Sequence, residues 1–180
     1  MKRYILTGAP GAGKTVILRA LQQRGFAIVE EAATDVCAFQ QPRGDETPWT
    51  SPHFIEDIVR LQCLRQEAVG AEGFAQVFDR SPVCTLALAR HLGFAVPDVL
   101  AQELDRVRAL RFYETKVFFI ESLGFIANTP IRRISLGEAE RFGQVHEAAY
   151  LERGYELVRI APGSPEERAD AVTRLIQGWG

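Results

Sequence analysis

The chain has 180 residues, of which 47% are hydrophobic and 24% are charged, and its formal net charge is −2. This length suits a single α/β domain with a substantial core, and the composition excludes a disordered chain. A nearly balanced charge gives no field that would attract nucleic acid or an anionic membrane, so we expect neither as a partner. Of the 21 basic residues only three are lysines, Lys2, Lys14 and Lys116, so an arginine here is informative only through its position.

The three cysteines, Cys37, Cys63 and Cys84, are widely spaced and form no C-x-x-C pair. This pattern is typical of free thiols in a reducing compartment and not of a disulfide framework or a zinc site. The start of the chain lacks the long apolar core of a signal peptide, and no apolar run approaches a membrane span. We therefore expect a cytoplasmic protein without membrane insertion.

The first predicted elements form a strand–helix–strand unit. The apolar run at 3–8 predicts a strand, and the apolar spacing at 14–25 predicts a helix that stops at its final glycine. The segment 26–31 predicts a second, buried strand that ends in the carboxylates Glu30 and Glu31. Such a unit is nearly always right-handed.

The middle of the chain predicts a loop, three helices and a strand. Three prolines and a glycine at 40–53 predict the loop, and 54–70 has the spacing of an amphipathic helix. A third strand in 74–82 is stopped by its proline, just after Asp-Arg-Ser. Helices are predicted through 86–93 and after a capping Asp98.

The last part of the chain predicts strands at 116–122 and 155–162, each followed by a helix. Both helices open with the pattern of a capping box, a serine followed three residues later by a glutamate, and the second also has a proline at its first position. These boxes are Ser135 with Glu138, and Ser164 with Glu167 after Pro165. Five strands alternating with helices, without a repeat or a composition break, predict one doubly wound, mainly parallel α/β domain over 1–180.

The segment GAPGAGKT at 8–15 matches the pattern G-x-x-x-x-G-K-[ST] in full. In such a loop backbone N–H groups wrap the phosphates, the lysine reaches the β- and γ-phosphates, and the threonine hydroxyl ligates Mg²⁺. The following helix adds the positive end of its dipole. The motif predicts a site for a nucleotide and Mg²⁺ formed by Gly8, Ala9, Pro10, Gly11, Ala12, Gly13, Lys14, Thr15 and Val16, with Thr15 as a metal ligand.

The end of the third strand bears on the fate of the γ-phosphate. Motor-type ATPases typically carry Asp-Glu there, whereas this chain has Asp79 followed by Arg80. Asp79 can hold Mg²⁺ or accept the proton of an attacking hydroxyl group, and Arg80 can stabilise the charge on a transferred group. The alternative is a structural Asp–Arg pair. No N-K-x-D element for guanine is present, which favours ATP over GTP and leaves GTP open.

Four further segments accompany the glycine loop: VEEA at 29–32, FDRSP at 78–82, TPIRRIS at 129–135 and ERGYELVRIAP at 152–162. Together they resemble the P-loop kinase-like "AAA domain" family of ATP- or GTP-binding proteins. That group is related to the nicotinamide riboside kinase domain of NadR-type proteins and to certain phosphoinositide-binding trafficking proteins. The resemblance covers most of the chain and implies a nucleoside-kinase-like P-loop core of five strands in the order 2-3-1-4-5, with a small lid at about 124–140.

The resemblance also implies roles for four residues. Glu30 or Glu31 stands where related kinases have a carboxylate that orients or deprotonates the acceptor hydroxyl, and we prefer Glu31 because the chain turns there. Arg132 and Arg133 would come from the lid onto the phosphates and exclude water. The alternatives are a solvated acidic pair and a solvated basic turn.

Aromatic residues in and beside the predicted loop, among them Trp49, can stack on a flat acceptor, although we prefer the alternative that they pin the loop to the core. The histidines His53, His91 and His146 lack metal-ligand spacing and are predicted to be structural. The loop after the fifth strand, at 160–167, resembles the one that packs against adenine in related kinases, but ordinary helix capping explains it as well.

These observations favour a small-molecule kinase that transfers the γ-phosphate of ATP, with Mg²⁺, to a nucleoside-like or other small hydroxyl acceptor. The alternatives are a nucleotide-dependent binding module that contacts a protein or lipid with little turnover, and a plain NTPase. The acceptor and the oligomeric state stay open. The predicted catalytic residues are Lys14, Glu31, Asp79, Arg80, Arg132 and Arg133, and the predicted Mg²⁺ ligands are Thr15 and Asp79.

Overall fold

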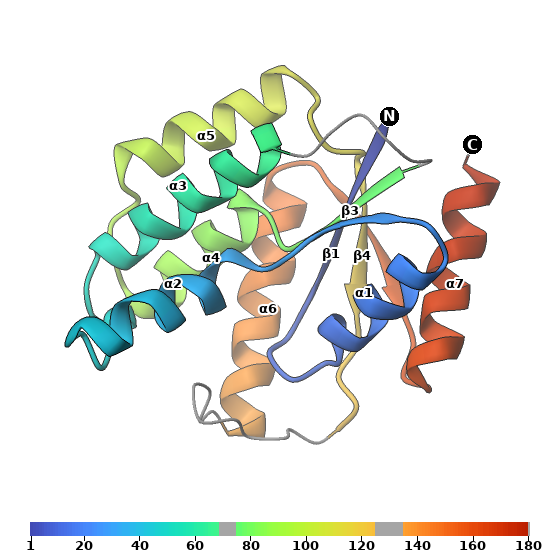
Figure 1. Ribbon diagram of the computed structural model, residues 1–180, viewed down its shortest axis with the longest axis horizontal. Helices are drawn as coiled ribbons and strands as arrows, with labels where there is room; N and C mark the ends of the chain where they lie inside the picture. The colour runs from blue at the N-terminus through green and yellow to red at the C-terminus, as the bar shows by residue number, and fades with distance from the viewer. Residues whose placement is uncertain (69–74, 125–134, 180) are drawn as a thin grey trace.

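The computed structural model describes residues 1–68, 75–124 and 135–179 (Figure 1). Its sheet has five parallel strands in the order β2-β3-β1-β4-β5, which confirms the predicted fold class and strand order. Each predicted strand is present with bounds that differ by a few residues, β1 being one residue longer and the other four shorter than predicted. The strands are β1 Lys2–Gly8, β2 Ala27–Val29, β3 Ala75–Asp79, β4 Lys116–Ile120 and β5 Glu156–Ile160.

Helices cover both faces of this sheet (Figure 1). Two of them, α1 and α7, lie on one face, and α3, α4, α5 and α6 lie on the other. The short helix α2 packs against α3. The helices are α1 Lys14–Gln23, α2 Ala32–Gln40, α3 His53–Ala68, α4 Pro82–Leu92, α5 Asp98–Ala109, α6 Leu136–Glu152 and α7 Pro165–Gly178, with 3₁₀ turns η1 Gln41–Arg43 and η2 Pro48–Thr50.

The central strands are apolar on both faces because both faces are covered. In β1 the side chains of Tyr4 and Leu6 belong to the core under α1 and α7, while Ile5 belongs to the core under the other helices. In β4, Phe118 and Val117 divide between the two cores in the same way. This packing fixes the strands, so the segments that follow their carboxyl ends are brought together at one edge of the sheet.

Both predicted capping boxes are confirmed, at the start of α6 and of α7. Helix α4 begins at Pro82, a turn earlier than predicted, because the Ser81 hydroxyl accepts a hydrogen bond from the N–H of Val83 (3.2 Å) and caps it. The prediction that Asp98 caps α5 is wrong. Pro97 holds the cap position in an extended conformation, and Asp98 lies inside the first turn, where its charge favours the helix dipole.

Two further differences concern loops. Helix α2 follows the second strand and was not predicted, because its buried face consists of only Ala32, Val36 and Cys37. The predicted loop at 40–53 includes the two 3₁₀ turns.

The predicted lid at 124–140 lies mostly outside the described residues, as do Arg132 and Arg133, so these predictions stay predictions. Within the described ranges, no helix combines the length and apolar character that a membrane span needs.

Candidate functional site

The glycine loop connects the carboxyl end of the central strand β1 to α1 (Figure 1). Gly8 has a φ of +138°, and a Cβ atom at this position would lie 2.3 Å from the carbonyl oxygen of Ile120 in the neighbouring strand. Gly13 caps α1 with a φ of +85°, in the left-handed region. Side chains are excluded at Gly8 and disfavoured at Gly13, so the loop backbone follows a path that other residues would not adopt.

Lys14 lies buried over its own loop. Its Nζ donates hydrogen bonds to the carbonyl oxygens of Gly8 (3.2 Å) and Ala9 (2.9 Å). The ammonium group is therefore held at the place where the motif expects phosphates to bind. Thr15 and Val16 are exposed on the first turn of α1.

Arg168 of α7 supports the loop from the other side. Its Nη1 donates to the carbonyl oxygen of Ala12 (2.8 Å), and its Nη2 donates to that of Glu121 after β4 (2.7 Å). Burial lowers the pKa of this guanidinium from its ordinary value, against a smaller opposite effect of Glu121. Sequence reasoning missed Arg168, because one arginine among many in an ordinary amphipathic helix gives no signal of a contact with a loop so distant in sequence.

Asp79 is the last residue of β3 and is buried. In the register of the sheet it lies beside Leu6 of β1, two residues before the glycine loop begins. The sheet register therefore places Asp79 close to the start of the glycine loop, and its role at the phosphates stays a prediction. A threonine hydroxyl and a carboxylate are oxygen donors of the kind that Mg²⁺ prefers, so Thr15 and Asp79 fit the predicted metal chemistry. Among the described residues, no group of three or more His, Cys, Asp or Glu side chains is placed to hold a metal ion without a nucleotide.

Arg80, next in the chain, enters the site through an unusual backbone conformation. Its φ is +72°, which few residues other than glycine adopt, and its side chain is buried. Its Nε donates to Oε1 of Glu31 (2.5 Å), while its Nη1 lies 2.9 Å from Nε2 of His146 and 3.5 Å from the carbonyl oxygen of Gly8. Burial opposes the charge, but Glu31 and other neighbours hold the pKa of Arg80 above its ordinary value, so the guanidinium stays protonated.

His146 of α6 is buried against this arginine. Its Nδ1 lies 2.8 Å from the carbonyl oxygen of Phe142, which can only accept, so Nδ1 carries the proton and Nε2 accepts from Arg80. Burial, and then the charge of Arg80, hold the pKa of His146 well below its usual value. The imidazole is therefore neutral. Sequence reasoning missed this contact, since His146 has no motif around it.

Glu31 occupies the N-cap position of α2, and its second carboxylate oxygen accepts a hydrogen bond from the Thr34 hydroxyl (2.8 Å). The neighbouring Glu30 is exposed, and its backbone carbonyl accepts from Arg65. Of the two candidate carboxylates, the structure places Glu31 next to Arg80 and on the wall of the cavity described next.

A cavity of about 380 Å³ opens between α2, α3, α4 and α6, with Pro10 of the glycine loop at its edge. Polar groups on its wall include Glu31, Arg80 and Gln62, whose Oε1 accepts a hydrogen bond from the Thr85 hydroxyl (3.0 Å). Most of the remaining wall is apolar or aromatic, as is usual for small-molecule sites: Trp49, Phe54, Ile58, Leu88, Leu92 and Phe142.

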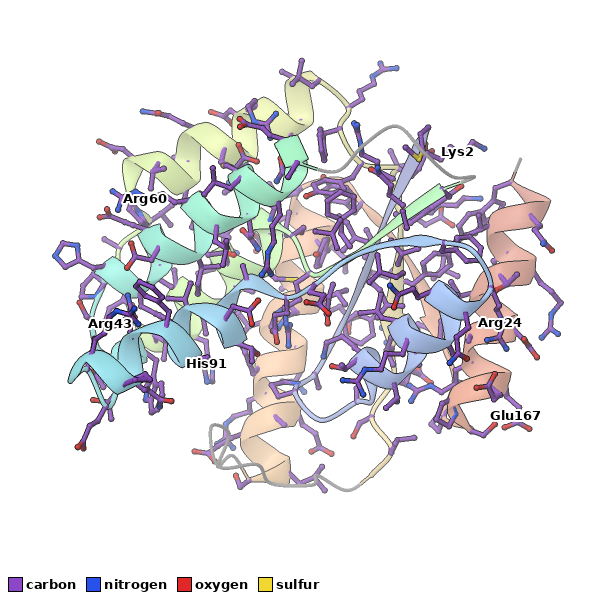
Figure 2. All side chains as sticks on the ribbon, in the orientation of Figure 1. Lys2, Arg24, Arg43, Arg60, His91 and Glu167 are labelled. Atoms are coloured by element: carbon purple, nitrogen blue, oxygen red, sulfur yellow. The ribbon has the colours of Figure 1, made fainter. Side chains whose placement is uncertain are left out.

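Trp49 packs against the core of α2 and α3, and it also lines the cavity, so that stacking on a flat acceptor stays a prediction. Phe39 does not line it and instead lies exposed under the guanidinium of Arg43, which is labelled in Figure 2. His91, also labelled in Figure 2, stacks on Phe142 at the cavity wall with ring centroids 4.5 Å apart. His91 and His146 both line the cavity and both pack against Phe142, so the prediction that they are structural stays a prediction.

Behind the cavity, a chain of hydrogen bonds joins β1, α4 and α6. The hydroxyl of Tyr150 lies 2.7 Å from Oγ of Ser81 and 3.1 Å from Sγ of Cys84, which lies 3.2 Å from the hydroxyl of Thr7. All four residues are buried. This network ties the first turn of α4 to β1 and α6.

Three comparisons with known proteins bear on this site. The family model described as "AAA domain" matches residues 3–168. Structures of deoxyadenosine kinase from M. mycoides have the same fold. One, with the products dCMP and a flexible dCDP bound, has a TM-score of 0.63 at 11% identity, and one with bound dCTP has a TM-score of 0.64 at 14% identity. Each alignment covers 99% of this chain and 100% of the other, and a search of curated proteins finds no match.

Proposed function

Because the chain belongs to the AAA domain family of P-loop proteins, we propose that it is an ATP-dependent phosphotransferase that acts on a small, uncharged hydroxyl compound of nucleoside-like size. One observation carries this proposal. The phosphate loop and the cavity are adjacent, since Pro10 of the loop lines the same cavity as Glu31 and Arg80. A nucleotide on the loop and a molecule in the cavity would therefore have their reacting groups at one place, which is what group transfer requires.

The nucleotide half of the site consists of the glycine loop, Lys14, Thr15 and Asp79. Lys14 holds the loop by its bonds to Gly8 and Ala9, and in the proposed complex its ammonium binds the β- and γ-phosphates. Thr15 and Asp79 would hold Mg²⁺, which, when bound with ATP, neutralises the charge of the phosphates. We propose ATP and not GTP as the donor, because the sequence has no guanine-reading element.

In the acceptor half, Glu31 is the proposed base. The hydroxyl oxygen of the acceptor attacks the γ-phosphorus, its proton passes to the Glu31 carboxylate, and the bond from the γ-phosphorus to the bridging oxygen of ADP breaks. Arg80 places a positive charge beside this centre, and most of the catalysis is positioning and electrostatic. Arg132 and Arg133, which lie outside the described residues, are proposed to close over the phosphates and exclude water.

The cavity wall supports an acceptor that carries no phosphate of its own. Among the described residues on this wall, the one arginine is Arg80, and its charge is matched by Glu31. A monophosphate would need further cations. The aromatic side chains instead suit a planar ring, and the amide of Gln62 suits a polar edge on that ring. Together these features favour a nucleoside-like compound.

A panel of nucleosides and other small hydroxyl compounds, incubated with Mg-ATP and analysed by mass spectrometry, tests the proposal. We expect one chemical class to gain a phosphoryl group, and we expect ADP formation to rise when that class is added. ATP turnover at equal rates with and without every acceptor would indicate a plain NTPase. Tight nucleotide binding without turnover would indicate a binding module. Either outcome overturns the proposal.

A further inference from the structure

We propose that His146 is a positioning residue that fixes the Arg80 guanidinium, so that Arg80 keeps its place between the acceptor carboxylate Glu31 and the phosphate loop during transfer. This inference rests on the proposed function for its catalytic consequence, whereas the contact itself is independent of that function. It assigns a role to a buried histidine that no sequence motif singles out.

Among the described residues, the Arg80 side chain contacts three hydrogen-bond partners that come from three parts of the fold. Glu31 stands at the start of α2, the carbonyl oxygen of Gly8 ends β1, and His146 belongs to α6. In the proposed reaction Glu31 takes the proton of the acceptor and loses its charge. The Gly8 carbonyl oxygen, 3.5 Å from Nη1, is the longest of the three contacts. His146 touches neither the nucleotide nor the proton in transit, so it is the constant partner of the three.

The imidazole is well fixed for this role. The residue is 1% exposed, its Nδ1 donates to the carbonyl oxygen of Phe142, and its ring lies tilted by 57° against the Phe142 ring with centroids 4.3 Å apart. With Nδ1 committed in this way, Nε2 can only accept, and the guanidinium of Arg80 is the donor that reaches it. A ring anchored at both nitrogens leaves Arg80 little freedom at its far end.

The electrostatic surroundings keep Nε2 of His146 unprotonated. Burial, Arg80 and Lys14 all lower the pKa of His146, while the Phe142 carbonyl and Glu31 act in the opposite direction with smaller total effect. The charged groups that face the ring are therefore two cations and one carboxylate. When Glu31 becomes protonated in the proposed reaction, Arg80 loses its ion pair but not its bond to His146. The positive charge then stays beside the phosphate loop at the moment that it is needed.

Three variants test the role. His146→Phe keeps the ring and removes both hydrogen bonds, and His146→Gln keeps an acceptor for Arg80 and a donor for Phe142. Tyr150→Phe is the matched control, since it removes hydrogen bonds to Ser81 and Cys84 from the next turn of α6 without touching Arg80. We expect His146→Phe to slow single-turnover phosphoryl transfer by about 10–100-fold. Its Kd for Mg-ATP should change by less than about threefold. His146→Gln should recover most of this rate, and Tyr150→Phe should keep it.

A double-mutant cycle shows whether the effect runs through Arg80. In an Arg80→Ala background, His146→Phe should slow transfer no further, whereas equal losses in both backgrounds would overturn the proposal. A second readout needs no acceptor. The Arg80 Nη1–H signal, observed by NMR with Mg-ADP bound, should be resolved in the wild type and in Tyr150→Phe and lost in His146→Phe, because Nη1 is the nitrogen that contacts His146. If that signal is unchanged in a folded His146→Phe protein, the positioning role is wrong, whatever the fate of the proposed reaction.

Discussion

The phosphate loop and the acceptor cavity meet at Pro10 but are built in different ways. The loop consists of contiguous residues between β1 and α1, and it would bind its ligand largely through backbone groups whose path depends on Gly8 and Gly13. The cavity is lined by side chains from α2, η2, α3, α4 and α6, which the chain supplies from distant positions. A backbone site tolerates few changes and holds a common ligand, whereas a side-chain site can change its ligand by single substitutions. Substitutions in the two regions should therefore have separable effects.

The largest effect is expected at Gly8 in the loop. A methyl group in Gly8→Ala would meet the Ile120 carbonyl oxygen at 2.3 Å, so the variant should lose Mg-ATP binding and about 3 kcal/mol or more of unfolding free energy. Gly25→Ala is the control, because its φ of +87° is also left-handed but nothing lies within 4 Å of the new atom. Its cost should be about 1–2 kcal/mol without loss of binding. Denaturant unfolding and nucleotide titration measure both. Equal effects of the two substitutions would contradict the close approach of β1 and β4.

The next largest effect is expected at the junction of the two regions. Glu31→Gln keeps the shape of the side chain and removes the proposed base, so transfer to the acceptor should fall by about 10²–10⁴-fold while Mg-ATP binding is retained. Glu30→Gln changes the exposed neighbouring carboxylate and should leave transfer unchanged. Steady-state kinetics on the identified acceptor decide between them. A loss in Glu30→Gln with normal rates in Glu31→Gln would show that the wrong carboxylate is assigned.

A moderate effect is expected at Arg168, behind the loop. Arg168→Met keeps much of the apolar stem and removes the bonds to Ala12 and Glu121, which should cost about 2–3 kcal/mol of unfolding free energy and weaken Mg-ATP binding. Arg24→Met removes ion pairs with Glu166 and Asp170 at the solvent-exposed contact of α1 with α7, where only a small change in unfolding free energy is expected. Calorimetry gives both quantities. Unchanged nucleotide affinity in Arg168→Met would limit this residue to a role in stability.

The smallest effect is expected deep in the cavity. Thr85→Val preserves the shape of the side chain and removes the hydrogen bond that holds the Gln62 amide. The KM for the acceptor should rise by about 3–10-fold, as expected for one neutral hydrogen bond, with the Kd for Mg-ATP unchanged. Initial rates over a range of acceptor concentrations measure this. A change in nucleotide affinity instead would show that the two regions are not separable.

The same contrast explains what the sequence could predict. The loop motif is contiguous, so Gly8, Lys14 and Thr15 and their strand–helix context were recognisable. The alternation of elements predicted a doubly wound parallel sheet, and the family resemblance implied its strand order. Asp79 was found because the carboxyl ends of parallel strands share an edge. The contacts of Arg168 and His146 join segments far apart in the chain, and no pattern of residue spacing predicts them. Helix α2 was missed because its buried face is short and consists partly of small residues, so the sequence shows little periodicity of apolar residues there.

The central claim is that both regions serve one reaction, in which the γ-phosphate passes directly from the loop to a molecule in the cavity. The most direct test uses ATP labelled with ¹⁸O in its γ-phosphate, an acceptor identified from the panel, and mass spectrometry of a single turnover. The account predicts that the labelled phosphoryl group appears on the acceptor, and that this product is strongly reduced in Glu31→Gln but not in Glu30→Gln. Labelled inorganic phosphate as the sole product, at a rate indifferent to the acceptor, would contradict it.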